Sequence, residues 1–301
     1  MNKQFSIAIY IYMLLAALFW ASAYVGIRIG LTSYTPDALA LLRYLTASVA
    51  IIPLYCKYRI PKAQSSYSNI IKALLIGVIG IGIYNLTLNI GELTVMAGTA
   101  SFIVSQIPVL LIIFAIIFLK ERVNIIAWLG IIISTIGISL ITLSHKSGVN
   151  FDWHIIYVLL ATVAAAIYSI LQKPLLSKIQ PIELAACAIW GGTGAMLIFL
   201  PRLITEIPHA SINATLAAIY MGIFPGVLSY TAWSMVLSRM PASRAAGYLY
   251  IVPVMTLVLG WLLLGEIPVF LSLFGGVAAL IGAVILHCSV GNQEPKPMSD
   301  A

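Results

Sequence analysis

The sequence repeats itself at an offset of 145 residues, without a gap. Proline, glycine and glutamate residues coincide at this offset: Pro36 with Pro181, Gly77 with Gly222, Pro108 with Pro253, Glu121 with Glu266, and Gly137 with Gly282. Such a register along a whole half-chain indicates one duplicated unit. We therefore expect two domains of one fold, residues 1–145 and 146–290, and a disordered cytoplasmic tail over residues 291–301.

The composition places both units in a membrane. Hydrophobic residues make up 61% of the chain and charged residues 8%, whereas soluble domains carry about a quarter charged residues. Apolar runs of roughly 20 residues, the length of a membrane-crossing helix, follow one another with short breaks. We expect an all-α membrane protein with ten transmembrane helices, over residues 7–29, 36–56, 70–91, 95–119, 124–144, 154–173, 181–201, 212–237, 242–264 and 268–289.

The odd number of spans in each unit makes the second unit enter the membrane from the opposite side. The sequence therefore predicts two inverted five-helix repeats, an arrangement typical of secondary transporters. If the two halves exchanged their conformations, an inward-open carrier would become an outward-open one.

Lysine and arginine residues predict the orientation, because cytoplasmic loops are enriched in them. With the N-terminus inside, most of the basic residues fall at the inner ends of helices, and Lys57, Arg59, Lys62 and Lys72 form the strongest cluster. We expect a multi-pass protein of the cell inner membrane with both termini cytoplasmic. The net charge of +7 then reflects membrane orientation, and we expect no nucleic-acid partner.

The sequence shows none of the common enzyme motifs, such as HExxH, GxSxG or a P-loop. Cys56, Cys187 and Cys288 are far apart and suggest neither a metal site nor a disulfide framework. We expect no catalytic residues, no metal and no cofactor, because a membrane-embedded enzyme would need a clustered catalytic set. The expected partners are a small-molecule substrate and the lipid bilayer, and both a monomer and a homodimer stay open.

Short motifs in both halves carry a family resemblance. They are Trp20-Ala-Ser-Ala-Tyr24-Val-Gly26-Ile-Arg28, Pro36 to Arg43, Ala97-Gly-Thr-Ala-Ser101, Leu119-Lys-Glu121-Arg and Leu264-Gly-Glu266. In their order and duplication they resemble the EamA-type transporters of the drug/metabolite transporter superfamily, over nearly the whole chain.

The resemblance implies a ten-helix carrier with a central cavity between the repeats and with the fifth and tenth helices at the periphery. Such carriers are commonly exporters of amino acids or other small metabolites, and metabolite efflux by alternating access is the function we expect. Since one fold serves many substrates, an importer or exchanger of a nucleoside-like metabolite or cofactor stays as the alternative.

Polar and aromatic side chains recur at helical spacing within the predicted spans, where lipid would solvate the polar ones poorly. Asn85 and Asn89 share one face of the third span with Glu92, where hydrogen bonding between helices is the alternative to a cavity role. The predicted substrate cavity is lined by Trp20, Tyr24, Arg43, Asn85, Asn89, Ser101, Ser105, Tyr168, Tyr230, Trp233 and Tyr250.

Arg43 lies about seven residues into the second span, at a depth of roughly 10 Å. An arginine at this depth costs a few kcal/mol unless it is paired or hydrated. It either attracts a substrate carboxylate or has a structural or gating role. Pro108 and Pro253 are predicted hinges, or sources of static curvature. Glu121 and Glu266 are expected to be structural, because a carboxylate favours the positive start of a helix.

The sequence carries no acidic residue or histidine near a span centre, although proton-coupled carriers usually keep such groups inside the membrane. Asp37, Glu92 and Glu183 lie at or near span ends. The sequence therefore favours facilitated diffusion, and coupling through one of these three residues is the alternative.

The predicted orientation can be tested with reporter fusions at the C-terminus. A reporter that is active only in the cytoplasm should give the signal, because the tail that follows ten spans returns to the side of the N-terminus. A strong signal from a reporter that is active only outside would contradict the span count or the orientation.

Overall fold

The computed structural model describes residues 7–59, 66–107, 109–110, 113–114, 125–144, 152–239, 249 and 251–291. Within these ranges the chain is helical and contains no strand. Six helices in them are long and apolar enough to cross a membrane: Ile9–Gly30, Pro36–Tyr58, Tyr67–Gly91, His154–Leu175, Pro181–His209 and Ile212–Arg239. Shorter apolar helices cover Trp128–Gly137, Ile251–Leu264 and Leu273–Gly282.

The all-helical membrane class is thus confirmed, and the count of ten spans stays a prediction. The predicted spans 95–119 and 242–264 lie partly outside the described residues. So do Pro108, Glu121, Tyr250 and most of the predicted tail.

The first half contains α1 (Ile7–Gly30), α2 (Pro36–Tyr58), α3 (Tyr67–Gly77), α4 (Tyr84–Gly91), α5 (Ala97–Val104) and α7 (Ile125–Ser144). The second half contains α8 (His154–Leu175), α9 (Pro181–Met196), α10 (Leu200–Glu206), α11 (Ile212–Met221), α12 (Tyr230–Arg239), α14 (Ile251–Leu264) and α15 (Phe270–Gly291). Two π-helical segments, η1 (Val78–Ile83) and η4 (Gly222–Ser229), join α3 to α4 and α11 to α12. They occupy matching places in the two halves.

Helices α2 and α9 lie antiparallel and are tied together at both ends. Each begins with proline at its first position, where the missing N–H breaks no helical bond, and each has an acidic residue in its first turn. Asp37 of α2 accepts from Arg202 of α10 at 2.8 Å, and Glu183 of α9 pairs with Arg59 after α2 at 3.6 Å. The two helices therefore form a head-to-tail clasp between the halves.

Glycines allow backbones from different halves to touch. A Cβ atom on Gly77 would lie 2.0 Å from the carbonyl oxygen of Ala188, and one on Gly222 would lie 2.4 Å from that of Arg43. These two contacts are exchanged by the 145-residue offset. Such close approach strengthens helix packing in lipid, where the hydrophobic effect gives no drive for association.

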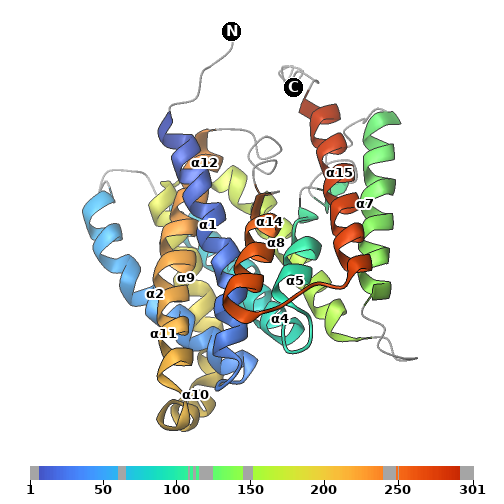
Figure 1. Cartoon of the computed structure of the whole chain (residues 1–301). Helices are drawn as coiled ribbons and strands as arrows, with labels where there is room; N and C mark the ends of the chain where they lie inside the picture. The colour runs from blue at the N-terminus through green and yellow to red at the C-terminus, as the bar shows by residue number, and fades with distance from the viewer. Residues whose placement is uncertain are drawn as a thin grey trace, which may run out of the picture.

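Helices α7 and α15 pair along their lengths at one edge of the molecule (Figure 1). A Cβ atom on Gly137 would lie 2.6 Å from the carbonyl oxygen of Gly275, and one on Gly282 would lie 2.6 Å from that of Gly130. The glycines that the sequence places on one face of each helix therefore seat the two helices on each other.

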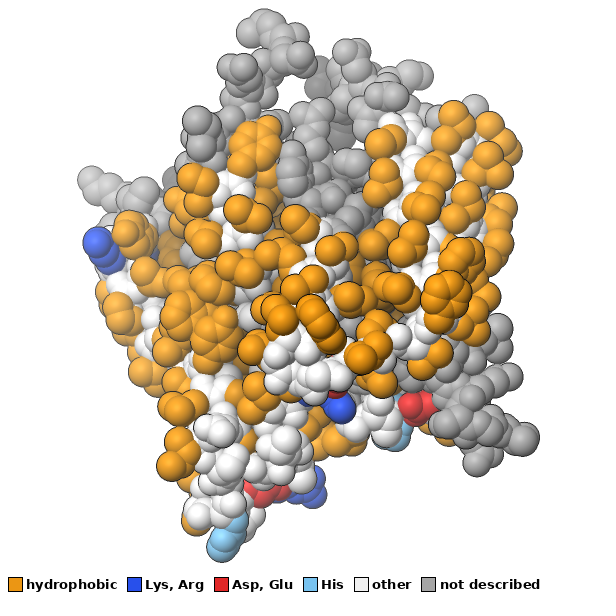
Figure 2. All heavy atoms as spheres, viewed as in Figure 1, with side chains coloured by type: hydrophobic (Ala, Val, Ile, Leu, Met, Phe, Trp, Pro, Cys, Tyr) orange, Lys and Arg blue, Asp and Glu red, His pale blue; other side chains and the backbone are white. Residues whose placement is uncertain are grey.

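The outer surface shows a broad apolar band (Figure 2). In this view the acidic and histidine side chains gather towards the lower end, beneath the apolar band. Figure 1, from the same side, shows that α1 begins and α15 ends at the opposite, upper end. This division of the surface is typical of a protein that sits in a bilayer.

The glycine contacts predict opposite effects for two alanine substitutions in helices. Gly77→Ala should lower the free energy of unfolding by about 1–3 kcal/mol, because its methyl group would overlap a backbone carbonyl. Gly194→Ala should raise it by roughly 0.4–1 kcal/mol, because nothing lies within 4 Å of the added carbon. Thermal unfolding of both variants in detergent checks the order, and a Gly77→Ala variant as stable as the parent would contradict this account of the packing.

Candidate functional site

A cavity of about 90 Å³ lies between helices of both halves. This volume is far above a packing defect and has room for several water molecules. Eight of the predicted residues line it: Trp20, Tyr24, Arg43, Ser101, Ser105, Tyr168, Tyr230 and Trp233. The wall also contains Ala23, Gly80, Tyr84, Leu88, Val104, Ile107, Ala165, Ser169, Leu249 and Val252.

Aromatic side chains from α1, α8 and α12 form one wall of the cavity. The Trp20 ring meets Tyr230 and Trp233 edge-on, with centroids 5.8 and 5.7 Å apart. Tyr168 meets Tyr230 at 6.0 Å. The Tyr230 hydroxyl donates to the carbonyl of Gly80 at 3.3 Å, within the π-helical turn η1. Edge-to-face contacts hold these rings in place, so the wall offers a fixed apolar surface.

Arg43 brings a positive charge to this wall. Its side chain is buried, and its guanidinium carbon lies 5.2 Å from the centre of the Tyr44 ring. Its Nε has no hydrogen-bond partner among the described residues. A buried cation needs an anion or water to offset its lost hydration. The cavity can therefore hold a negatively charged group beside Arg43.

Asn85 and Asn89, two further residues of the predicted substrate cavity, are not among the residues that line this cavity. Asn85 donates to the Tyr44 hydroxyl at 2.9 Å and to the carbonyl of Ile81 at 2.8 Å. Asn89 donates to the carbonyl of Pro36 at 2.9 Å. Helix α4 turns this polar face towards α2, where the amides find partners. Their side chains thus make the hydrogen bonds between helices that the sequence leaves open as the alternative to a cavity role.

Two other predicted residues lie away from the cavity wall. Pro253 is buried in the first turn of α14, as far as the helix is described, where a missing N–H breaks no helical bond, and its hinge role stays a prediction. Glu266 lies outside the membrane-crossing part of α14 and accepts from the backbone N–H of Ala97, the start of α5, at 3.0 Å. It therefore ties its loop to a helix of the other half and not to the helix that follows it.

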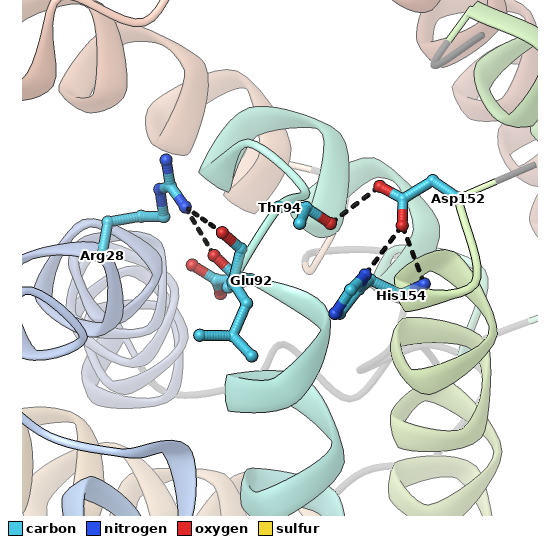
Figure 3. A network of polar contacts seen from close by, with 6 residues as sticks. Arg28, Glu92, Thr94, Asp152 and His154 are labelled. Atoms are coloured by element: carbon cyan, nitrogen blue, oxygen red, sulfur yellow. Dashed lines mark hydrogen bonds and ion pairs between the residues drawn. The ribbon is translucent and has the colours of Figure 1, made fainter. Parts of the chain in front are cut away.

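Arg28 completes a polar cluster that the sequence did not predict (Figure 3). Its Nε donates to Glu266 Oε1 at 2.8 Å, and its Nη1 donates to the carbonyl oxygens of Glu92 and Leu93 at 2.5 and 3.3 Å. The four-residue step from Tyr24 to Arg28 could have placed Arg28 on the cavity face. No sequence signal could have paired it with Glu266, which is 238 residues away.

Asp152 anchors the start of α8 beside this cluster (Figure 3). It accepts from the Thr94 hydroxyl at 2.7 Å and from the backbone N–H of His154 at 2.9 Å, and it pairs with the His154 ring at 2.8 Å. Partial burial acts to raise the pKa of Asp152, but these hydrogen bonds and His154 outweigh it and hold that pKa below its ordinary value. The carboxylate thus ties α8 to the loop after α4.

Two buried tyrosines give a matched test of which hydroxyls belong to the scaffold. Tyr44→Phe should cost about 0.5–1.5 kcal/mol of stability, because Asn85 loses an acceptor. Tyr168→Phe should leave stability nearly unchanged, because its hydroxyl has no partner among the described residues. Thermal unfolding in detergent compares them, and equal losses would contradict the assignment of Tyr168 to the cavity.

Comparison with known proteins agrees with this architecture. Residues 7–143 and 152–288 each match the EamA-like transporter family. The uncharacterized transporter YdfC of Bacillus subtilis is 38% identical, over 91% of this chain and 89% of that protein. A probable terminal-alkyne amino-acid exporter of Streptantibioticus cattleyicolor is 32% identical, over 91% and 92%. One crystal structure shares the fold with a TM-score of 0.64 at 14% identity, over 92% of this chain and 95% of that one. The chain belongs to the EamA-like transporter family.

Proposed function

We propose that this transporter exports amino acids or related carboxylate-bearing metabolites by alternating access. The observation that carries the proposal is the buried guanidinium of Arg43 beside an aromatic wall, in a cavity to which both halves contribute. A carboxylate would pair with Arg43, and an apolar side chain would lie against the rings. A relative named as an amino-acid exporter, 32% identical, supports this substrate class.

We also propose that residues 1–145 and 146–290 are inverted five-helix repeats within ten spans. Reciprocal contacts support this: Gly77 packs on Ala188 as Gly222 packs on Arg43. Two copies related by a two-fold axis make each contact twice in this way. Ser48 and Thr193, which are 145 residues apart, hydrogen-bond to each other at 2.8 Å. A residue that meets its own equivalent lies beside such an axis.

The proposed place is the inner membrane, with both termini in the cytoplasm. The start of α1 and the end of α15 at one end of the bundle agree with an even number of crossings (Figure 1). Lys57 in the last turn of α2 supports the same orientation. The end of the cavity nearer to Arg28, Glu92 and Glu266 then faces outward.

A nucleoside-like substrate is the second candidate, because the aromatic wall would also stack against a base. The two candidates differ in what they ask of Arg43. An amino acid would need its charge, whereas a neutral nucleoside would not.

Transport by the purified protein in liposomes tests the proposal. Amino acids with apolar side chains should exchange across the bilayer, and neutral nucleosides should not. Uptake of nucleosides alone would favour the second candidate. Absence of transport together with hydrolytic activity would instead support a membrane-embedded enzyme.

Arg43 variants sharpen the test. Arg43→Ala should raise the apparent KM for an amino acid by about 10- to 100-fold, the equivalent of roughly 1.5–3 kcal/mol for a hydrogen bond to a charged group. Arg43→Lys should retain part of the affinity because it keeps the charge. Exposed Arg239 offers the matched control, and Arg239→Ala should transport like the parent. An Arg43→Ala variant with normal stability and unchanged KM would remove Arg43 from the site.

A further inference from the structure

The cluster of Arg28, Glu92 and Glu266 lies one helical turn beyond the cavity wall on three helices. Tyr24, Leu88 and Ser101 line the cavity. Arg28 follows Tyr24 by four residues, Glu92 follows Leu88 by four, and Ala97, which Glu266 binds, precedes Ser101 by four. Four residues of helix span about 6 Å. The cluster therefore lies at one end of the cavity.

At this end of the cavity the guanidinium of Arg28 connects three segments: α1, the loop before α15 and the loop after α4. Arg28 of α1 binds Glu266 before α15 and the carbonyls of Glu92 and Leu93 after α4. Glu266 in turn binds the start of α5. We call Arg28 and Glu266 the latch, because their ion pair joins the two halves of the chain.

Glu92 sits behind the latch and differs from other acidic residues of the chain. Its side chain is fully buried, and neither carboxyl oxygen has a hydrogen-bond partner among the described residues. Asp37, Asp152 and Glu266 each accept hydrogen bonds. A buried carboxylate without donors costs several kcal/mol, and protonation removes this cost. The closed arrangement therefore suits a neutral Glu92.

The charges around Glu92 do not offset its burial. Burial raises the pKa of Glu92 well above its usual range, Arg28 and Arg43 act against this rise, and Glu266 adds to it. Arg28 points its nearest donors at backbone carbonyls and at Glu266, and not at the Glu92 carboxyl. Five titratable or charged groups interact electrostatically with Glu92: Tyr24, Arg28, Arg43, Tyr84 and Glu266. The ends of α2 and α8 that lie nearest to the end of α4 also carry Asp37, Asp152 and His154.

We propose that Glu92 is a proton-binding site whose protonation holds this end of the cavity closed and whose ionisation opens it. An ionised Glu92 would compete with Glu266 for Arg28 and would draw in water, and both effects break the latch. On closing, a proton passes from water to the carboxylate.

The pH-dependent closure does not depend on the proposed transport function. Only its consequence for proton coupling rests on that function. If the protein is an alternating-access carrier, each closure of this end takes up a proton. If that proton is released to the other side of the membrane before this end reopens, a proton gradient drives transport, in place of the facilitated diffusion that the sequence favours.

The pKa of Glu92 in the open and closed states determines whether a rise in pH favours or disfavours closure. Open and hydrated, Glu92 has the pKa of an ordinary glutamate, about 4.3, and closed it has a raised pKa. Closure is therefore favoured fully below the lower value and is lost as the pH rises through the higher one. Between them one proton binds on closing, so the ratio of closed to open molecules falls about tenfold per pH unit.

Distances between two spin labels on the full-length protein test this directly. Thr32, at the turn after α1, and Ile267, after Glu266, are exposed and lie outside the latch. Each would be replaced by cysteine after the native Cys56, Cys187 and Cys288 are changed to serine. Between pH 5 and 9 we expect a short distance at low pH and a growing population of longer distances as the pH rises.

Three variants in the same background complete the test. Glu92→Gln mimics the protonated side chain and should give the short distance at every pH. Glu92→Asp keeps a titratable carboxyl and should keep a pH response. Glu183→Gln alters another buried glutamate, at the opposite end of the α2–α9 clasp, and should respond like the parent.

Three results would overturn the proposal, and two of them are a distance in the parent that does not change with pH and a Glu92→Gln variant that responds like the parent. The third is the opposite pH dependence: a latch held only by the Arg28–Glu266 ion pair would open in acid, so that the distance between the labels would grow as the pH falls. Should Glu92→Gln aggregate, the parent and Glu92→Asp titrations still decide. The measurement needs no substrate, so failure of the proposed transport function leaves this test intact.

Discussion

The contact of helix backbones across the two halves is the interaction on which the rest of the structure depends. In lipid, helices gain little from burying apolar surface, so close packing and interhelical hydrogen bonds hold them together. Gly222 of the second half packs on the carbonyl of Arg43, and Gly77 of the first half packs on that of Ala188. Because Gly222 fixes the backbone of Arg43, the same contact that joins the halves also holds its side chain at the cavity.

Polar groups of the interior differ in whether a neighbouring helix supplies a hydrogen-bond partner. Asn85, Asn89 and Thr193 have partners on neighbouring helices and stabilise the scaffold. The Arg43 Nε and the Tyr168 hydroxyl have no partner among the described residues, and both residues line the cavity. Since an unsatisfied buried group is costly, a ligand or water in the cavity would stabilise these two groups.

The candidate site could be predicted in part, because helical spacing places side chains on faces but does not say what each face meets. Trp20, Tyr24 and Arg43 line the cavity, and their contact with a substrate stays a prediction. The stripe of Asn85, Asn89 and Glu92 shares one face, yet the amides bond to α2 while Glu92 lies behind the Arg28–Glu266 pair. The spacing is the same for all three, and only the neighbouring helices separate their roles.

The sequence by itself determined the environment and the duplication of this protein. Apolar runs of membrane length and a register of 145 residues need no tertiary information, because each reports a local or periodic property of the chain. The tertiary structure decided which polar groups meet. Arg28 and Glu266 stand 238 residues apart and belong to different halves, and their pairing depends on how the halves pack. It also decided that Glu92 is left without donors, since a buried carboxyl finds partners only where other helices supply them.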